Sequence, residues 1–217
     1  MKKIIVFDLD GTLLDTLGDL HAAVNHALKS ENLPLRSIDE VRSFVGNGMR
    51  LLMERALPAD ADAALFARAF AAFKAYYSAN CAHFTREYDG ITALLQKLKA
   101  EGALLGVVTN KADAPAKTLM EHYFPGLFDS VVGEREGVRR KPAPDSVWET
   151  VRTLGGSVDD AVYIGDSEVD AQTAKNAGTA LVGVTWGFRS RETLEKAGAQ
   201  LFADSPAELF EILKTMG

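Results

Sequence analysis

Hydrophobic and polar residues follow two alternating patterns from residue 91 onward. Short apolar runs rich in Val, Ile and Leu, without polar alternation, predict buried strands, and apolar residues spaced three or four apart predict helices between them. The expected strands are 104–109, 130–132, 161–164 and 179–184, and the expected helices are 91–101, 114–122, 144–154, 169–177 and 206–214. This order predicts a Rossmann-like α/β core, in which a parallel sheet lies between two layers of helices.

The segment from residue 15 to residue 85 has a different pattern. Apolar residues recur there at helical spacing, as in the series that begins at Leu20, and no run predicts a strand. The apolar run at 3–8 most simply joins the sheet as its first strand. The sequence therefore predicts a catalytic core of residues 1–14 and 86–217, with an all-helical cap domain of residues 15–85 inserted in it.

Composition excludes several classes of partner. The chain has 217 residues, of which 47% are hydrophobic, so it can bury an ordinary core. A net charge of −6 and the lack of a basic stretch beyond Arg139–Lys141 argue against nucleic acid and anionic membranes as partners. The single Cys81 allows no intramolecular disulfide and fits a reducing cytoplasm. The oligomeric state, monomer or dimer, stays open.

Polar residues gather directly after the expected strands. Four such stretches occur, at residues 8–12, 109–111, 140–142 and 165–170. An open parallel sheet binds its ligands beyond the carboxyl ends of the strands, so these stretches are expected to meet at one edge.

Asp8 and Asp10 lie two residues apart, which in an extended chain places both carboxylates on the same side. At about 4 Å and an effective dielectric constant near 20, two such charges repel by about 4 kcal/mol, and Asp166 adds a third. Either a cation lies there or some of the carboxylates are protonated. Oxygen ligands without nearby Cys or His favour Mg²⁺, with Asp8, Asp10 and Asp166 as the candidate metal-binding residues.

Carboxylates beside a metal ion can attack phosphorus directly. One aspartate would form an aspartyl-phosphate, while the other would protonate the leaving oxygen and then activate water. Thr109 and Asn110 are candidates to donate hydrogen bonds to the phosphoryl oxygens, and Lys141 to supply a fixed positive charge. Asp170 would hold metal-bound water or orient Lys141, although it also fits an ordinary acidic first-turn residue of a helix that Ser167 caps.

Taken in this order, the four stretches resemble the motifs of the haloacid dehalogenase-like hydrolase superfamily. They read DLDGT at 8–12, VVTN at 107–110, RRKP at 139–142 and GDSEVD at 165–170. The resemblance implies that Asp8 is the nucleophile and Asp10 the general acid and base. It further implies that Mg²⁺ is held by the Asp8 carboxylate, the Asp10 backbone carbonyl and Asp166. The presence of Asp10 implies the phosphatase branch rather than carbon–halogen cleavage.

Within that superfamily the chain looks most like phosphoglycolate phosphatases. The features that carry this resemblance are GNG at 46–48, LMERAL at 52–57 and VTNK at 108–111. The expected function is a Mg²⁺-dependent phosphatase that hydrolyses a small phosphorylated metabolite, with phosphoglycolate as the leading candidate. Arg50, just past the Gly-Asn-Gly turn, is a candidate ligand for a substrate carboxylate, and Lys111 is considered in the same way.

Three alternatives accompany this expectation. A β-phosphoglucomutase-like mutase or a pyrophosphatase would use the same core. The mutase resemblance is weakened because Leu20 stands where those enzymes carry a cap histidine. From a different class, receiver-type phospho-acceptor domains also place acids, a Thr and a Lys at the ends of a parallel sheet.

Overall fold

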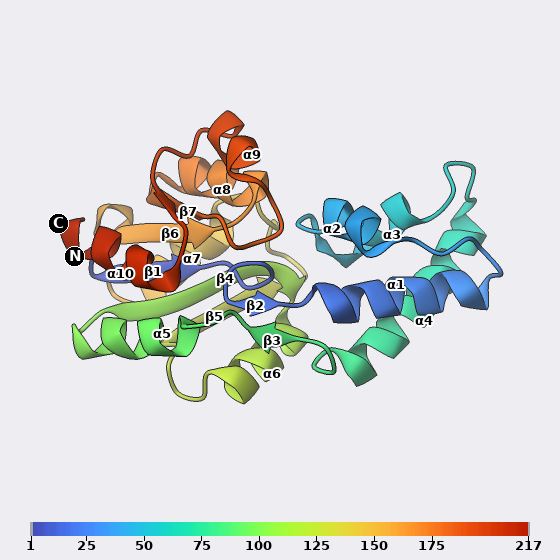
Figure 1. Cartoon of the computed structure of the whole chain (residues 1–217), viewed down its shortest axis with the longest axis horizontal. Coiled ribbons are helices and arrows are strands. Elements are labelled where there is room, and N and C mark those ends of the chain that lie inside the picture. The colour runs from blue at the N-terminus through green and yellow to red at the C-terminus, as the bar shows by residue number, and fades with distance from the viewer. Residues whose placement is uncertain (1, 217) are drawn as a thin grey trace. The chain divides into compact units, whose positions relative to one another are not determined.

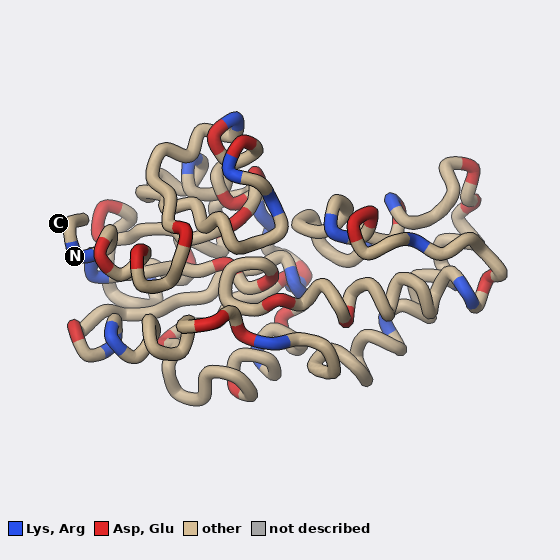
Figure 2. The backbone as a smooth tube through the Cα atoms, viewed as in Figure 1, with Lys and Arg blue, Asp and Glu red and all other residues tan. Residues whose placement is uncertain are grey.

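Two compact units divide the chain. The core unit comprises Met1–Leu14 and Glu87–Gly217, and the cap unit comprises Asp15–Arg86. The computed structural model describes residues 2–216. Figure 2 shows acidic and basic residues interspersed along both units, without a long stretch of one sign. Within the described residues no helix combines the length and the apolar character that crossing a bilayer requires.

A six-stranded sheet forms the centre of the core unit, with strand order β5-β4-β1-β6-β7-β8 (Figure 1). The strands are β1 (Ile4–Phe7), β4 (Leu104–Ala112), β5 (Ser130–Glu134), β6 (Ala161–Gly165), β7 (Ala180–Val184) and β8 (Phe202–Ala203). All neighbouring strands pair in parallel. Because later strands lie on both sides of β1, its carboxyl end is the point where ligands of such sheets bind.

Helices cover this sheet, which confirms the predicted α/β class. They are α5 (Ile91–Ala100), α6 (Asp113–Tyr123), α7 (Asp145–Thr153), α8 (Glu168–Ala177), α9 (Arg191–Lys196) and α10 (Pro206–Thr215). Helix α7 packs on β1, β4 and β5, and its neighbour α8 packs on β6 and β7. Helices α5 and α10 contact each other, and α5 also packs on β4. A short 3₁₀ helix, η1 (Val158–Asp160), precedes β6.

Strand β1 shows why the apolar run has no polar alternation. All four of its residues are fully buried. Ile4 and Val6 belong to a cluster with Val147 and Val151 of α7, together with Tyr163 of β6. A strand that is covered on both faces gains from an apolar side chain at every position.

The structure differs from the expected elements at the sheet margins. Strand β4 runs three residues past the predicted end at Thr109, and its register with β5 shifts between Val108 and Ala112. The polar residues in this bulged segment are buried, so their polarity does not mark the end of the strand. Strand β8 and helix α9 were not predicted, because two and six residues are too few to show a period.

The cap unit contains four helices, namely α1 (Leu17–Ser30), α2 (Ile38–Phe44), α3 (Gly48–Ala56) and α4 (Ala63–Asn80). Helix α1 packs on α2 and α4, and α3 packs on α2 and α4. A capping box of Ser37 and Glu40 begins α2. The expectation of no strand was wrong at the margin, because β2 (Leu14–Asp15) and β3 (Arg86–Glu87) pair as a two-stranded sheet.

Candidate active site

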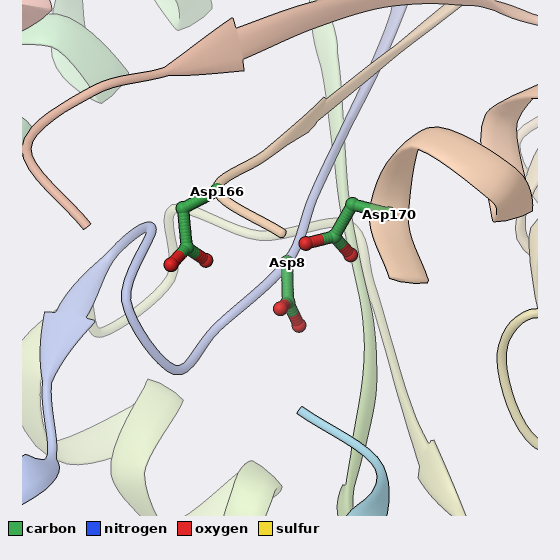
Figure 3. Close-up of side chains that lie close together, drawn as sticks. All are labelled: Asp8, Asp166 and Asp170. Atoms are coloured by element: carbon green, nitrogen blue, oxygen red, sulfur yellow. The ribbon is translucent and has the colours of Figure 1, made fainter. Parts of the chain in front are cut away.

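Three buried carboxylates meet at the carboxyl edge of the core sheet (Figure 3). Asp8 directly follows β1, and its backbone N–H donates to the carbonyl of Ile164 at 2.9 Å. Asp166 follows β6, and Asp170 lies in the first turn of α8. One carboxylate oxygen from each of these aspartates lies within 4.8 Å of the other two. Adjacent parallel strands therefore bring residues 158 positions apart in the sequence into one cluster.

Two glycines allow this close packing around Asp166. Gly11 has a φ of +88°, and a Cβ atom there would lie 2.4 Å from Oδ2 of Asp166. A Cβ atom on Gly187 would lie 2.3 Å from the Cβ atom of Asp166. The same segments donate to its carboxylate, from the Thr12 hydroxyl at 3.2 Å and the Phe188 N–H at 2.7 Å. These contacts fix the orientation of Asp166.

Lys141 is the cation that contacts the cluster. Its Nζ atom lies 2.8 Å from Oδ1 of Asp8 and 2.8 Å from Oδ1 of Asp170, and its side chain is 3% exposed. Burial acts to lower the pKa of Lys141, but the carboxylates of Asp170 and Asp8 outweigh burial and hold that pKa well above its ordinary value. Lys141 is therefore a permanent positive charge beside Asp8.

Asp170 contacts both Lys141 and the start of α8, while its predicted contact with metal-bound water stays a prediction. Its Oδ2 atom accepts hydrogen bonds from the N–H and the hydroxyl of Ser167, at 3.1 Å and 2.6 Å, in a capping box that begins α8. Its Oδ1 atom accepts a hydrogen bond from the ammonium group of Lys141. Because both oxygens are engaged, Asp170 orients Lys141 while it caps the helix.

The cluster carries more negative than positive charge. Burial, followed by the nearby charge of Asp170, raises the pKa of Asp8 to about 7, although Lys141 opposes this. Burial and the charges of Asp170 and Asp8 also raise the pKa of Asp166 well above its ordinary value. Without a further cation, the site would therefore hold protons near neutral pH. An all-oxygen donor set with excess negative charge fits a hard divalent ion such as Mg²⁺.

The side chain of Asp10 is not part of the cluster that Asp8, Asp166 and Asp170 form. Its Oδ1 atom accepts a hydrogen bond from Nζ of Lys111 at 2.8 Å. The carboxylate that completes the trio is that of Asp170, whereas the sequence pattern suggested the side chain or the backbone of Asp10. A role of the Asp10 carboxylate in proton transfer and the composition of the metal site stay predictions.

The end of β4 presents the other residues expected to bind phosphate. Thr109 is buried, and its hydroxyl oxygen accepts the N–H of Lys111 at 3.2 Å, so its own proton can be donated. The side-chain amide of Asn110 donates to the backbone carbonyl of Lys141 at 3.1 Å. Asn110 thus links β4 to the segment that carries Lys141, and a phosphoryl contact by Thr109 or Asn110 stays a prediction.

Arg50 lies in the cap unit, on α3. Its guanidinium lies 2.9 Å from Oε1 of Glu54 and 4.7 Å above the centre of the Phe66 ring, and its side chain is 61% exposed. Together with Glu54, Phe66 and Phe70, it lines a groove of about 800 Å³ within the cap. Its predicted contact with a substrate carboxylate stays a prediction.

Sequence reasoning missed Tyr163, which lies at the centre of the polar network. Its hydroxyl accepts a hydrogen bond from Lys141 at 3.0 Å and lies 3.0 Å from the carbonyl of Val108, to which it donates. The residue stands inside the apolar run that predicts β6, and nothing in that pattern marks its hydroxyl as part of a site. The loop at 186–188 was also missed, although its position directly after β7 was the available signal. There the indole N–H of Trp186 donates to the carbonyl of Thr12 at 3.0 Å.

Comparison with known proteins agrees with this fold. The haloacid dehalogenase-like hydrolase family matches residues 5–184, which is most of the chain. The chain belongs to this family of hydrolases. The match includes all four polar strand ends, from Asp8 to Asp170.

Its relatives lie in the phosphoglycolate phosphatase branch. A phosphoglycolate phosphatase of Cereibacter sphaeroides is 36% identical over 216 residues, which cover 98% of each chain. One from Mesorhizobium japonicum is 38% identical over 202 residues, or 89% of this chain and 87% of the relative. A crystal structure of a candidate phosphoglycolate phosphatase from Lactobacillus delbrueckii subsp. bulgaricus superimposes with a TM-score of 0.94 at 36% identity, covering 98% of both chains. The predicted enzyme class, a phosphatase of this family, is thereby confirmed.

Proposed function

We propose that this chain is a Mg²⁺-dependent phosphatase that hydrolyses a small phosphorylated metabolite, with phosphoglycolate as the first candidate, through an aspartyl-phosphate. The observation that carries this proposal is the cluster of Asp8, Asp166 and Asp170, in which Asp8 and Asp170 contact the ammonium of Lys141. Three buried carboxylates and one cation are costly as a purely structural arrangement, and such cost is characteristic of functional sites.

The residues present fit a divalent ion at the edge of β1 and β6. The carboxylates of Asp8 and Asp166, with the backbone carbonyl of Asp10, are the proposed ligands. When bound, Mg²⁺ would offset the excess negative charge and polarise the phosphoryl oxygens. Asp170, whose oxygens contact Lys141 and Ser167, is proposed as a charged neighbour of this ligand set.

The first chemical step forms the covalent intermediate. A carboxylate oxygen of Asp8 bonds to phosphorus while the bond between phosphorus and the ester oxygen breaks. Asp10, in its protonated form, donates its proton to that leaving oxygen, so the product leaves as an alcohol. Lys141 and the hydroxyl of Thr109 would stabilise the charge on the transferring phosphoryl group.

The second step releases phosphate. Asp10, now a carboxylate, takes a proton from a water molecule that attacks phosphorus, and the bond to the Asp8 oxygen breaks. This regenerates the Asp8 carboxylate and the protonated form of Asp10. One residue thus acts as acid and then as base, which requires its carboxyl group to be held in one place through both steps.

The choice of phosphoglycolate is supported by the relatives named for that activity. Recognition of phosphate by this fold is supported by the structure of CbbY from Rhodobacter sphaeroides, which was solved in complex with phosphate and is 26% identical with a TM-score of 0.79 over 96% of both chains. Phosphoglycolate carries a carboxylate besides its phosphate, and Arg50 of the cap is the proposed ligand for that group.

The alternatives differ in how well they fit the described residues. Leu20, at the position where the mutases carry a histidine, is buried in the cap unit. The neighbouring His21 is engaged within the cap, with Nε2 lying 3.0 Å from the carbonyl of Arg36. The receiver-type alternative is set aside, because the family match places the chain among hydrolases. A cytoplasmic location stays a prediction from the cysteine content.

The proposal is tested by phosphate release from a panel of small phosphate esters that includes phosphoglycolate, glucose 1-phosphate and pyrophosphate. We expect Mg²⁺-dependent turnover of phosphoglycolate, and no turnover by the Asp8→Asn variant. Phosphoryl transfer between sugar positions would indicate a mutase instead, and preference for pyrophosphate would indicate a pyrophosphatase. If the wild-type protein and Asp8→Asn released no phosphate from any ester, the proposal would be wrong.

A further inference from the structure

Lys111 and Asp10 form an ion pair at the carboxyl edge of the core sheet. Nζ of Lys111 lies 2.8 Å from Oδ1 of Asp10, and the two side chains are 2% and 16% exposed. An ammonium group that is nearly removed from water is costly unless it is paired, so this contact is held far more firmly than a surface ion pair.

The backbone of β4 directs Lys111 toward Asp10. Thr109 and Lys111 lie two residues apart near the end of this strand. The register shift between β4 and β5 falls in this segment, and the hydroxyl of Thr109 accepts the N–H of Lys111 within it. Bulges of this kind redirect side chains near active sites.

Strand β5 supports the bulge at close range. A Cβ atom on Gly133 would lie 2.8 Å from the backbone carbonyl oxygen of Lys111 and 2.4 Å from Cα of Asp113. The backbone N–H of Gly133 also donates to the carboxylate of Asp113 at 3.0 Å. Strand β5 therefore packs closely against the segment that carries Lys111.

We infer that Lys111 is a positioning residue for Asp10: its ammonium holds Oδ1 and thereby fixes the direction of the carboxyl group that takes part in the proposed chemistry. This inference deepens the proposed function and rests on it. It replaces the earlier expectation that Lys111 contacts a substrate carboxylate, because the ammonium is buried against a carboxylate of the chain itself.

Substrates with different leaving groups distinguish three roles of Lys111: positioning of Asp10, contact with a substrate carboxylate, and a purely structural role. An alkoxide must be protonated as it leaves, whereas p-nitrophenolate is stable without a proton, so only alkyl esters depend strongly on a positioned acid. The quantity to compare is kcat/KM, because it reports the steps up to departure of the leaving group and not the later hydrolysis of the intermediate. Ethyl phosphate, phosphoglycolate and p-nitrophenyl phosphate form the substrate set, in which ethyl phosphate lacks the carboxylate of phosphoglycolate.

For Lys111→Met, we expect kcat/KM to fall roughly 10- to 100-fold on ethyl phosphate and on phosphoglycolate, and by less than about threefold on p-nitrophenyl phosphate. Lys117→Met is the matched control, because Lys117 forms an exposed pair with Asp113 on the neighbouring helix α6, and it should leave all three values unchanged. An equal loss on all three esters would indicate a merely structural role, and a loss on phosphoglycolate alone would indicate a carboxylate contact. Either result would overturn the inference.

A second measurement does not depend on activity. The melting temperatures of Lys111→Met, Asp10→Asn and the double variant show whether the two side chains are coupled. We expect the double variant to lose less than the sum of the two single losses, whereas additive losses would overturn the inference even in a protein without turnover. Failure of the proposed function would show separately, as a wild-type protein whose phosphate release matches that of Asp8→Asn.

Discussion

Both units contain buried aspartates, but the surroundings of these aspartates differ. In the cap unit, Asp19 accepts hydrogen bonds from the N–H of Phe84 at 2.9 Å, from the N–H of Thr85 at 2.8 Å and from its hydroxyl at 2.7 Å. In the core unit, three carboxylates lie within 4.8 Å of one another beside one ammonium. Asp19 is a lone carboxylate whose donors satisfy it, which is typical of a structural role. In the core, donors are also present, but three carboxylates crowd together, and that crowding favours a bound cation.

The comparison predicts that removing one carboxylate of the crowded cluster costs activity and not stability. Asp8→Asn removes the proposed nucleophile, so we expect kcat to fall at least about 1000-fold. Because it also removes a source of repulsion within the cluster, the melting temperature should stay the same or rise. Phosphate release and thermal unfolding of one preparation check both expectations. A destabilised Asp8→Asn protein with substantial activity would break the comparison.

The matching prediction for the cap is the reverse. Asp19→Asn turns an amide N–H toward backbone N–H donors, so the free energy of unfolding should fall by about 2 to 4 kcal/mol. For a chain of this length that is roughly 5 to 15 °C in melting temperature. Below the melting range, kcat should stay within about twofold of the wild-type value, since Asp19 takes no part in the proposed chemistry.

The control for this variant is Asp60→Asn, because Asp60 is an exposed aspartate of the same unit. Its free energy of unfolding should change by less than about 0.5 kcal/mol. Equal stability of Asp19→Asn and Asp60→Asn would show that the donors around Asp19 contribute nothing.

A third prediction concerns pH and Mg²⁺. The pKa of Asp8 is raised from 3.8 to about 7 in the folded protein, while the unfolded chain keeps the ordinary value. Between these values the folded state binds more protons, so the stability of metal-free protein decreases as the pH rises from about 4 to about 7. The raised pKa of Asp166 extends this trend in the same direction.

Mg²⁺ binds the ionised carboxylates, so its stabilising effect should grow as the pH rises. At about 100 times its dissociation constant, a ligand adds about 2.7 kcal/mol, which is roughly 5 to 11 °C here. We expect that gain near pH 8 and little of it near pH 5, measured as the melting temperature with Mg²⁺ minus that with EDTA. A gain that does not change with pH, or one that survives in Asp166→Asn, would contradict the proposed ligands.

The sequence was enough to predict that Asp8 and Asp166 lie close together, because the position of each at the end of a parallel strand determines this. Asp8 and Asp166 each follow an apolar run, and parallel strands place their carboxyl ends at one edge. Lys141 was recognised from its motif. The helices of the core were also predictable, because each spans several turns of a regular apolar pattern.

Other features depend on tertiary geometry that no local pattern records. The pairing of Lys111 with Asp10 needs a bulge, and a bulge is set by the neighbouring strand and by Gly133 rather than by the sequence of β4. Thr109–Lys111 are polar but buried, so the sequence pattern placed the end of the strand too early. In the cap, the donors that satisfy Asp19 come from residues 65 and 66 positions later.

The smallest expected effect concerns the Tyr163 hydroxyl. Its removal tests how far the orientation of the Lys141 ammonium matters when the charge of that group is unchanged. It contacts Lys141 at 3.0 Å and the carbonyl of Val108 at 3.0 Å, in a fully buried position. Tyr163→Phe keeps the ring but leaves that carbonyl without its donor, so we expect a loss of about 1 kcal/mol in stability. Lys141 keeps both carboxylate partners, so kcat should fall only about three- to tenfold. Tyr76→Phe, on the cap helix α4, is the control and should leave kcat unchanged; an equally unchanged kcat in Tyr163→Phe would show that Asp8 and Asp170 alone orient the ammonium.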